Sequence, residues 1–415
     1  MLNCLRLTKP AAVAAVTMFA VGAIAIPAQP ARADTIRAGQ KWVFDMLDVV
    51  PAWQQSQGGG VTVAVIDSGA DGRVSDLTQQ VAQGPDFTGV STKPASPDWG
   101  VHGTWMASLI AGHGHDGGGS GVIGVAPEAK LLSIRVIPDR ADPRYGTYEH
   151  EPEPQIQQSL ANGINYAVRN GAQVISMSIG YSAPSTVVRK ALLNAFSHRV
   201  VVVASAGNSG GSPGHYGQAP ESFPADYPGV ISVGAVNSGG AVAGFSSSNL
   251  SVQVAAPGVN VPAQGRDGQY WYVSGTSPAC ALVAGVTALI KSRYPDLAPD
   301  LVARALTSTT SDRPAGRYDS QIGFGIVDAA AALTRAGRLA GSGGSGRKDQ
   351  TPAGISATGV SAAIHFGGGP AAIPPEPVRP RGQSQLILYS LLALTCLVLV
   401  AAAVTRLAIL RRSRQ

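Results

Sequence analysis

Five short apolar runs constrain the fold of this chain more than any other feature. They cover residues 61–67, 130–137, 172–179, 199–207 and 229–236. Each run is rich in Val and Ile and almost continuously apolar, which is typical of parallel strands buried on both faces. Segments with helical spacing lie between them at 156–171 and 185–199. This alternation predicts a doubly wound α/β domain, with a mainly parallel sheet and helices on both of its faces.

Polar residues stand where several of the predicted strands end. Asp67 ends the first strand, Ser178 lies at the end of the third, and Asn208 just follows the fourth. In open α/β sheets, ligands bind beyond the carboxyl ends of the strands. Two further polar residues, His102 and Ser277, each stand at the start of an apolar, helix-like segment. The sequence therefore predicts a functional site at this edge of the sheet.

Taken singly, each of these polar residues has a simpler structural explanation. Asp67 could be a turn residue, and Asn208 could occupy a left-handed turn. His102 and Ser277 could each cap a helix. Taken together, their order along the chain suggests a mechanism, because a carboxylate, an imidazole and an alcohol can form one nucleophilic catalyst.

Four segments around these residues resemble the motifs of the subtilisin-like serine peptidases. The matching stretches are DSG at 67, HGT at 102, SAGN ending at 208 and GTS ending at 277. The family's chain order of Asp, His and Ser is the order found here. The resemblance covers roughly residues 55–333 and implies a subtilisin-like fold. It also implies a serine endopeptidase that acts on protein or peptide substrates, with no cofactor and no catalytic metal.

The resemblance assigns a role to each matching residue. Ser277 would be the nucleophile, and His102 the base that takes its proton and later protonates the leaving amine. Asp67 would fix the imidazole tautomer, and Asn208 would donate its side-chain amide to the oxyanion together with the backbone N–H of Ser277. The residues that would line the peptide-binding cleft beside the scissile bond are Ser178, Ile179, Gly180, Ser205, Ala206 and Gly207.

Four positions near the predicted site depart from the common subtilisin pattern. Pro278 stands where the family usually has a residue other than proline, and Trp105 stands where it usually has a second histidine. Ala281 and Leu282 replace the usual Pro and His. None of them belongs to the triad, so we expect an altered substrate pocket around intact catalytic residues.

The two ends of the chain carry targeting signals. Residues 1–33 have the charged start, apolar core and small-x-small ending of a secretory signal peptide, with an uncleaved anchor as the alternative. Residues 386–405 form an apolar run long enough to reach nearly across a bilayer, with a buried core helix as the alternative. The basic residues 406–415 place that end in the cytoplasm. We therefore expect a single-pass cell-membrane protein whose catalytic domain is extracellular.

The remaining chain divides into a domain and a tether. Residues 34–339 hold the strand and helix patterns, and residues 340–385 are Gly-, Ser- and Pro-rich, which is typical of a flexible linker. The net charge of +6 comes from the two ends, whereas the middle of the chain is net negative. The predicted domain therefore shows no nucleic-acid footprint.

This layout resembles the mycosins, which are membrane-anchored subtilases associated with type VII secretion in actinobacteria. The resemblance implies a type VII secretion membrane complex as a partner. An alternative function is that of a structural subunit, which would brace such a complex whatever its catalysis. Only about 33 residues lie between Asp34 and Asp67, which is too few for a separately folded inhibitory prodomain, so we expect residues 34–60 to pack along the domain.

Three local features complete the sequence-based expectations. Residues 112–119 contain two histidines and an aspartate that could invite a metal, although a solvated loop is the favoured interpretation. Residues 138–155 are charged and Pro-containing, and we expect a surface loop at the edge of the substrate cleft. Cys280 is expected to pack as a small apolar side chain.

Overall fold

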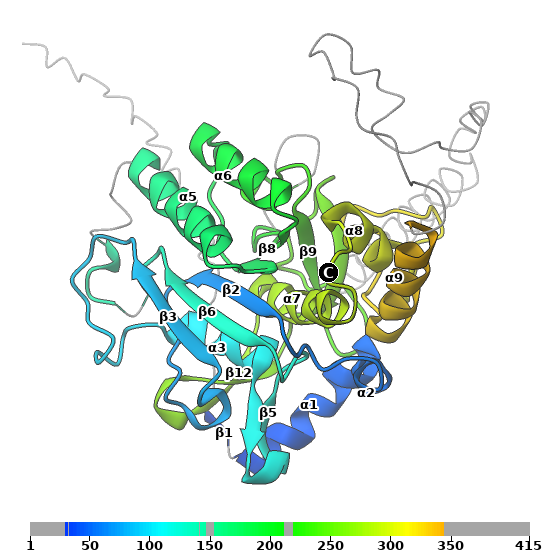
Figure 1. Ribbon diagram of the computed structural model, residues 1–415. Helices are drawn as coiled ribbons and strands as arrows, with labels where there is room; N and C mark the ends of the chain where they lie inside the picture. Colours follow the sequence, from blue (N-terminus) through cyan, green and yellow to red (C-terminus); the bar gives the residue numbers. More distant parts are fainter. Residues whose placement is uncertain (1–29, 32, 141, 147–152, 211–218, 344–415) are drawn as a thin grey trace, which may run out of the picture. The chain divides into compact units, whose positions relative to one another are not determined.

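A parallel sheet forms the centre of the computed structural model, which describes residues 30–31, 33–140, 142–146, 153–210 and 219–343 (Figure 1). This sheet has seven strands in the order β10-β9-β8-β7-β2-β6-β3, and its neighbouring strands pair in parallel. The strands, in chain order, are β2 (Thr62–Asp67), β3 (Val81–Asp86), β6 (Lys130–Arg135), β7 (Val174–Met177), β8 (Val201–Ser205), β9 (Ile231–Val236) and β10 (Val252–Pro257). The predicted α/β fold with a mainly parallel sheet is confirmed.

Two small antiparallel sheets accompany the central one. They are formed by β1 (Pro30–Ala31), β12 (Tyr270–Val273) and β11 (Val261–Gln264), and by β4 (His113–His115) with β5 (Ser120–Ile123). The first sheet joins residues 30–31 to the distant strands β11 and β12. The second is a hairpin whose two strands are separated by a tight turn.

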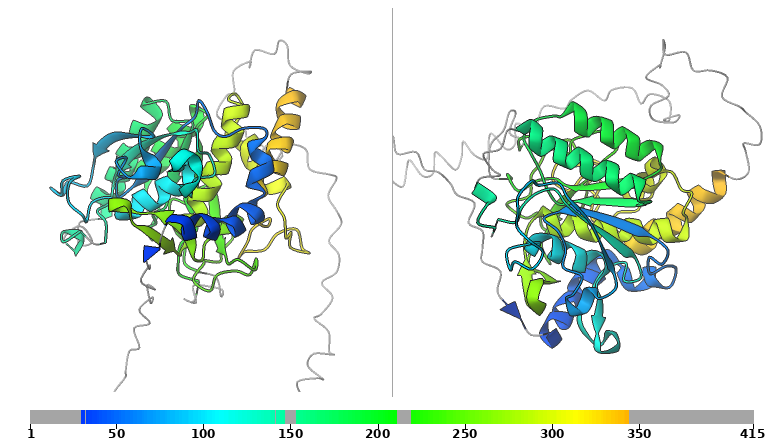
Figure 2. Two further views of the ribbon diagram at one scale, coloured as in Figure 1. Left: turned by 90° about the horizontal axis from the view of Figure 1, so that it is seen from below. Right: turned by 60° about the vertical axis from the view of Figure 1, so that its left-hand side comes forward.

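Helices cover both faces of the central sheet. They are α1 (Ala33–Leu47), α2 (Val49–Trp53), α3 (Val101–Ala111), α5 (Glu153–Arg169), α6 (Thr186–Ser197), α7 (Thr276–Arg293), α8 (Pro299–Ser308) and α9 (Ala329–Gly343). Figure 2 shows α5 and α6 on one face, with α1 and α7 on the other. Short 3-10 turns are η1 (Ser75–Leu77), η2 (Asp116–Gly118) and η4 (Arg266–Gly268).

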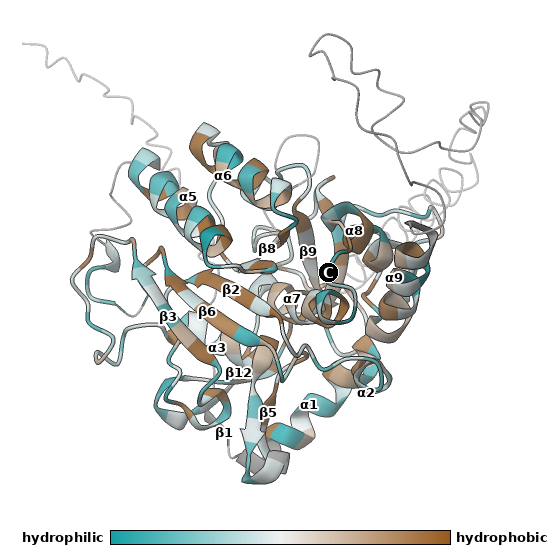
Figure 3. Ribbon diagram, in the orientation of Figure 1, coloured by the Kyte–Doolittle hydropathy of each residue, from teal (hydrophilic) through white to brown (hydrophobic). Residues whose placement is uncertain are grey.

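The packing of β2 on both faces explains why its sequence is almost continuously apolar. Val63 and Val65 belong to the apolar cluster shared with α3 and α7, whereas Ala64 and Ile66 belong to the cluster shared with α5 and α6. Alternate side chains point to opposite faces of a strand, so a strand covered on both sides must be apolar at every position. Figure 3 shows hydrophobic stretches along the central strands, such as β2 and β6, and alternating hydrophilic and hydrophobic residues along α5 and α6.

The N-terminal segment packs along the domain, as predicted for residues 34–60. Val43 and Leu47 of α1 are buried in the main core, and the Trp53 indole donates to the Val125 carbonyl at 2.8 Å. The Arg37 guanidinium donates to two carbonyls of the β4–β5 hairpin, at 2.8 and 2.9 Å. These contacts make the segment an integral part of the domain.

Several sequence-based predictions concern residues outside this description. They are the signal peptide apart from its last few residues, the linker beyond residue 343, the transmembrane helix at 386–405 and the basic tail at 406–415. Among the helices that the structure does describe, none combines the length and the apolarity needed to cross a membrane.

Candidate active site

Asp67 and His102 form the first part of the candidate site. Asp67 is the last residue of the central strand β2 and is only 1% exposed. His102 is the second residue of α3, and its Nδ1 lies 2.8 Å from Asp67 Oδ1. Burying a carboxylate is costly without a partner, and the imidazole supplies one. The hydrogen bond fixes the tautomer of the ring, with the proton on Nδ1 and Nε2 available as a base.

A glycine allows α3 to approach the end of β2 closely enough for this contact. A Cβ added to Gly103 would lie 2.0 Å from the Gly69 carbonyl oxygen and 3.3 Å from the Asp67 Cβ. Any larger residue would therefore push the helix away from the strand. The contact with Asp67 thus explains the histidine of the HGT motif, and the close approach of α3 to β2 explains its glycine.

The electrostatic surroundings favour the protonated imidazole of His102, whose pKa lies above the ordinary histidine value. Burial is the largest single influence and lowers the pKa, but the influences that raise it, led by the charge and the hydrogen bond of Asp67, together outweigh it. The charge of Asp139 also raises it, whereas Arg140 lowers it. The ring is 32% exposed and thus open to a substrate. An imidazole that is stabilised as imidazolium is suited to take a proton from an alcohol.

Ser277 is the second residue of α7, so the alternative of a simple helix cap is wrong for it. The N-cap of α7 is Gly275. The Ser277 hydroxyl lies 3.4 Å from the Ser178 carbonyl oxygen, and the Ser178 hydroxyl donates to the Ser277 carbonyl at 3.1 Å. These contacts hold the start of α7 against the end of β7. The hydroxyl therefore stands at a helix N-terminus, where backbone N–H groups are free to bind a negative charge.

Asn208 is fixed beside the same helix start. Its Oδ1 accepts hydrogen bonds from the backbone N–H and the hydroxyl of Thr276, both at 2.9 Å. The amide Nδ2 of Asn208 takes part in neither of these hydrogen bonds. A Cβ added to Gly275 would lie 3.5 Å from Asn208 Nδ2 and 3.6 Å from the Ser277 nitrogen. The two nitrogen atoms therefore both lie close to one point beside Gly275.

The predicted cleft residues leave two neighbouring strands at the same edge of the sheet. Ser178, Ile179 and Gly180 follow β7, while Ser205 ends β8 and is followed by Ala206 and Gly207. Gly207 donates its backbone N–H to the Thr276 hydroxyl at 3.2 Å, which ties this segment to the start of α7. Both segments therefore contact the start of the helix that carries Ser277.

The residues that depart from the subtilisin pattern lie around this site. The Trp105 ring stands edge-on to His102, with ring centroids 6.3 Å apart, and packs against Trp271 at 6.0 Å. Ala281 and Leu282 are buried within α7. Cys280 is fully buried in the main apolar cluster, which confirms that it packs as a small apolar residue, and this burial raises the pKa of its thiol to about 12.

Sequence reasoning missed two residues that hold His102 in place. The Ser68 hydroxyl and the Asp139 carboxylate both accept hydrogen bonds from the first turn of α3. Asp139 was expected in an exposed loop at 138–155, but it is 7% exposed, so the prediction is wrong for this part of the loop. Ser68 stands in the DSG motif but was given no role, and no motif marks Asp139, because both act through contacts between distant segments.

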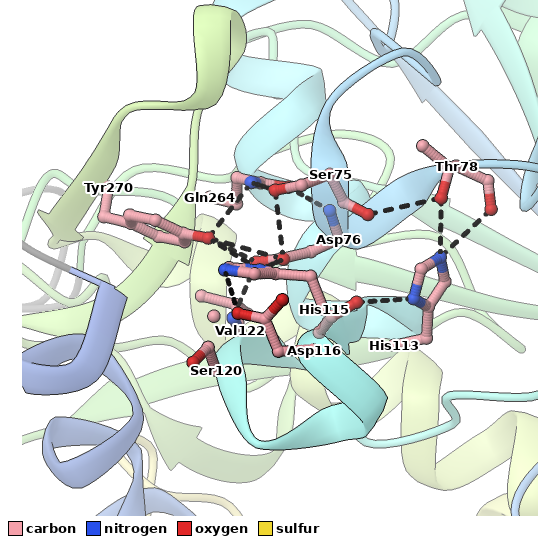
Figure 4. A network of polar contacts seen from close by, with 12 residues as sticks. Ser75, Asp76, Thr78, His113, His115, Asp116, Ser120, Val122, Gln264 and Tyr270 are labelled. Atoms are coloured by element: carbon pink, nitrogen blue, oxygen red, sulfur yellow. Dashed lines mark hydrogen bonds and ion pairs between the residues drawn. The ribbon is translucent and has the colours of Figure 1, made fainter.

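The histidines at 112–119 lie in a hairpin and not in a solvated loop, which corrects the prediction (Figure 4). His115 Nδ1 lies 2.7 Å from Oδ1 of Asp76, a carboxylate that is 0% exposed. The Tyr270 hydroxyl donates to the same carboxylate, and burial raises the pKa of Tyr270 to about 12. Among the described residues, no group of three or more His, Cys, Asp or Glu side chains could hold a metal.

Comparison with known proteins identifies the family. Residues 58–325 match the model of the subtilase family. The chain is a subtilase. Subtilisin DY from Bacillus licheniformis is 36% identical over 279 residues, which are 67% of this chain and 93% of the relative. Family membership makes this chain a serine endopeptidase that acts on peptide substrates.

Two further relatives show which subtilases it resembles. Mycosin-1 from Mycolicibacterium smegmatis is 32% identical over 336 residues, which are 72% of this chain and 73% of that protein. The structure of the MycP3 protease from the type VII (ESX-3) secretion system aligns with a TM-score of 0.59 and 32% identity, over 70% of this chain and 87% of that one. This subtilase is therefore mycosin-like.

Proposed function

We propose that this subtilase cleaves peptide bonds with Asp67, His102 and Ser277 through an acyl-enzyme. The observation that carries the proposal is the 2.8 Å contact between His102 Nδ1 and the buried carboxylate of Asp67. A histidine held in this way is a base in a defined tautomer, and this is its role in serine peptidases. The location of Ser277 at the start of α7, beside Asn208, supports the same reaction.

The proposed reaction has two stages. His102 accepts the hydroxyl proton of Ser277 while Oγ bonds to the carbonyl carbon, and the carbonyl electron pair moves to oxygen. The Asn208 amide and the Ser277 backbone N–H donate to this oxyanion. The C–N bond then breaks as His102 protonates the leaving amine, and an ester on Ser277 remains. Water, deprotonated by His102, hydrolyses the ester and restores the hydroxyl.

Hydrolysis of casein by the full chain tests this proposal. We expect cleavage that Ser277→Ala abolishes, whereas the exposed Ser308 on α8 provides a matched control, and Ser308→Ala keeps full activity. Removal of one oxyanion donor from a subtilisin lowers turnover by about 10²–10³-fold, so Asn208→Ala should fall by a similar factor. Full casein hydrolysis by Ser277→Ala would overturn the assignment of the nucleophile.

We further propose that the chain is exported and anchored, with the catalytic domain outside the cell membrane and the C-terminus in the cytoplasm. The apolar run at 386–405 and the basic residues after it support this layout. The full chain should stay in the membrane fraction after alkaline carbonate extraction, and a variant that lacks residues 386–415 should be released. Release of the full chain would refute the anchor. An N-terminus sequenced near Asp34 would show that the signal peptide is removed.

The likeness to mycosin-1 and to MycP3 supports a link to type VII secretion. We propose that this subtilase acts with such a membrane complex, with a purely structural role as the alternative. Ser277→Ala and a deletion of residues 34–339 separate the two roles in the native host. If secretion fails in both variants, secretion depends on proteolysis by this subtilase. Secretion that survives Ser277→Ala but fails on deletion indicates a structural subunit.

A further inference from the structure

The first turn of α3, which carries His102, is capped by residues from elsewhere in the chain. The N-cap residue of α3 is Gly100, which has no side chain to accept a hydrogen bond from the turn. The backbone N–H of His102 donates to Asp139 Oδ2 at 2.6 Å, and that of Gly103 donates to the Ser68 hydroxyl at 3.1 Å. Unpaired N–H groups at a helix start need such acceptors, and a carboxylate there also interacts favourably with the helix dipole.

These bonds belong to a closed ring that begins and ends at His102. Asp139 Oδ2 also accepts from the Ser68 hydroxyl at 3.0 Å. The Ser68 backbone N–H donates at 2.7 Å to Asp67 Oδ1, the oxygen that also binds the His102 ring. Ser68 and Asp139 are 2% and 7% exposed, and hydrogen bonds shielded from water are electrostatically stronger. The imidazole and its own backbone are thus fixed to the same short segment.

The backbone of Asp139 is hydrogen-bonded to a residue of a buried ion pair. The backbone N–H of Asp142 donates to the Asp139 carbonyl at 2.9 Å, which closes a turn after β6. The Asp142 carboxylate accepts from the Arg135 guanidinium at 3.0 Å, and Arg135 also binds Asp86. Both side chains of the Arg135–Asp142 pair are almost fully buried. Asp139 is therefore linked through Asp142 to a buried ion pair.

We propose that Asp139 is a positioning residue, whose carboxylate holds the first turn of α3 so that His102 stays aligned for proton transfer from Ser277. The inference rests on the proposed function of His102 as the general base. Asp139 acts through the backbone of His102 and through its charge, and it does not touch the reacting atoms. Misalignment of a catalytic group by about 1 Å can cost 10²-fold in rate.

The charge of Asp139 adds a second, separable effect. Asp67, Asp139 and Arg140 are the charged groups that act on the His102 ring, and the first two raise its pKa. Replacing the Asp139 carboxylate by an amide keeps an oxygen acceptor for the backbone N–H but removes the negative charge. The acid limb of the pH profile should then move to lower pH, which a merely structural role of Asp139 would not cause.

The test compares Asp139→Asn, Asp139→Ala and Ser68→Ala in the full chain, with Asp300→Asn as the control. Asp300 is an exposed carboxylate in the first turn of α8. The readouts are kcat and KM on a fluorogenic peptide between about pH 5 and 9, with circular dichroism to check folding. We expect Asp139→Ala to lower kcat roughly 10- to 100-fold with KM little changed. Asp139→Asn should lose less activity, and its acid limb should shift to lower pH. Asp300→Asn should match the wild type.

The outcomes distinguish this inference from the proposed function. If Ser277→Ala is inactive while Asp139→Asn keeps the wild-type kcat and pH profile, the positioning role is refuted and the triad stands. If Ser277→Ala stays active, the proposed function itself fails. Should the Asp139 variants not fold, Ser68→Ala decides, because it removes the acceptor for Gly103 and a donor to Asp139. A folded Ser68→Ala with unchanged kcat would also refute the inference.

Discussion

Replacing Asp76 by Ala is expected to destabilise the domain although the residue is remote from the catalytic chemistry. The Asp76 carboxylate is fully buried and accepts hydrogen bonds from three elements. His115 Nδ1 of the β4–β5 hairpin lies 2.7 Å away, the Val122 backbone N–H of the same hairpin donates at 2.7 Å, and the Tyr270 hydroxyl donates at 3.1 Å. Removing the carboxylate leaves these donors without their acceptor (Figure 4).

The expected loss of stability depends on whether each donor can find another acceptor. In the variant, the buried Val122 N–H has no hydrogen-bond acceptor, which costs about 1–3 kcal/mol of stability. The Gln264 amide only donates to the Tyr270 oxygen, at 3.3 Å, but His115 Nδ1 lies 3.4 Å from that oxygen and can accept the hydroxyl proton. The His115 side chain is 28% exposed, so its other ring nitrogen can donate to water. These two donors add roughly 1 kcal/mol together. We expect Asp76→Ala to lower the free energy of unfolding by about 2–4 kcal/mol in total.

Urea unfolding of the full chain, followed by tryptophan fluorescence, measures this change. All five tryptophans of the sequence lie in the described domain, so the signal reports on its folding. Asp45→Asn is the control, because Asp45 pairs with Lys41 on an exposed face of α1 and should change stability by less than about 0.5 kcal/mol. A change for Asp76→Ala as small as that of the control would refute the reasoning about stranded donors.

Three further predictions concern other parts of the domain. Asp142→Ala leaves the buried Arg135 with one carboxylate fewer and should lower the free energy of unfolding by about 3 kcal/mol in the same urea assay, whereas no change would refute a stabilising pair. Gly103→Ala places a Cβ against the Gly69 carbonyl, so fluorophosphonate labelling should slow by roughly 10²-fold, and wild-type labelling would contradict the close approach. His102 must be neutral to act as a base, and its pKa is raised, so kcat/KM should fall with decreasing pH through a midpoint above the ordinary value of about 6.5. A midpoint below 6.5 would contradict a raised pKa of His102.

The central part of the fold is predictable from the sequence, because its strands are buried on both faces. Each of the five predicted runs corresponds to a strand, namely β2, β6, β7, β8 and β9. Strand β3 was not predicted, since it lies at the edge of the sheet and contains Gly84 and Pro85 among partly exposed residues. Strand β10, at the other edge, was not recognised either. Partial exposure explains the absence of a continuous apolar pattern in β3, whereas β10 is buried at five of its six residues and its apolar run is interrupted by Gln253.

The site is predictable to a different degree at different positions. Asp67 and His102 stand in short motifs whose chemistry is recognisable, and the structure brings them into contact. Asp139 could not be predicted, because its capping of α3 depends on a contact with a residue 37 positions earlier in the sequence. His115 was assigned to a solvated loop because its partner, Asp76, is 39 residues earlier in the sequence. Contacts of this kind leave no periodic pattern along the chain.

Identification of the residue that becomes covalently modified tests the central claim most directly. The full chain would be treated with a fluorophosphonate, digested and examined by tandem mass spectrometry, with Ser277→Ala treated in parallel. A serine activated by His102 should carry the phosphonyl group on the peptide that contains residue 277, and the variant should remain unmodified. Modification at another serine, or equal modification of both proteins, would contradict the account of Ser277 as the activated nucleophile.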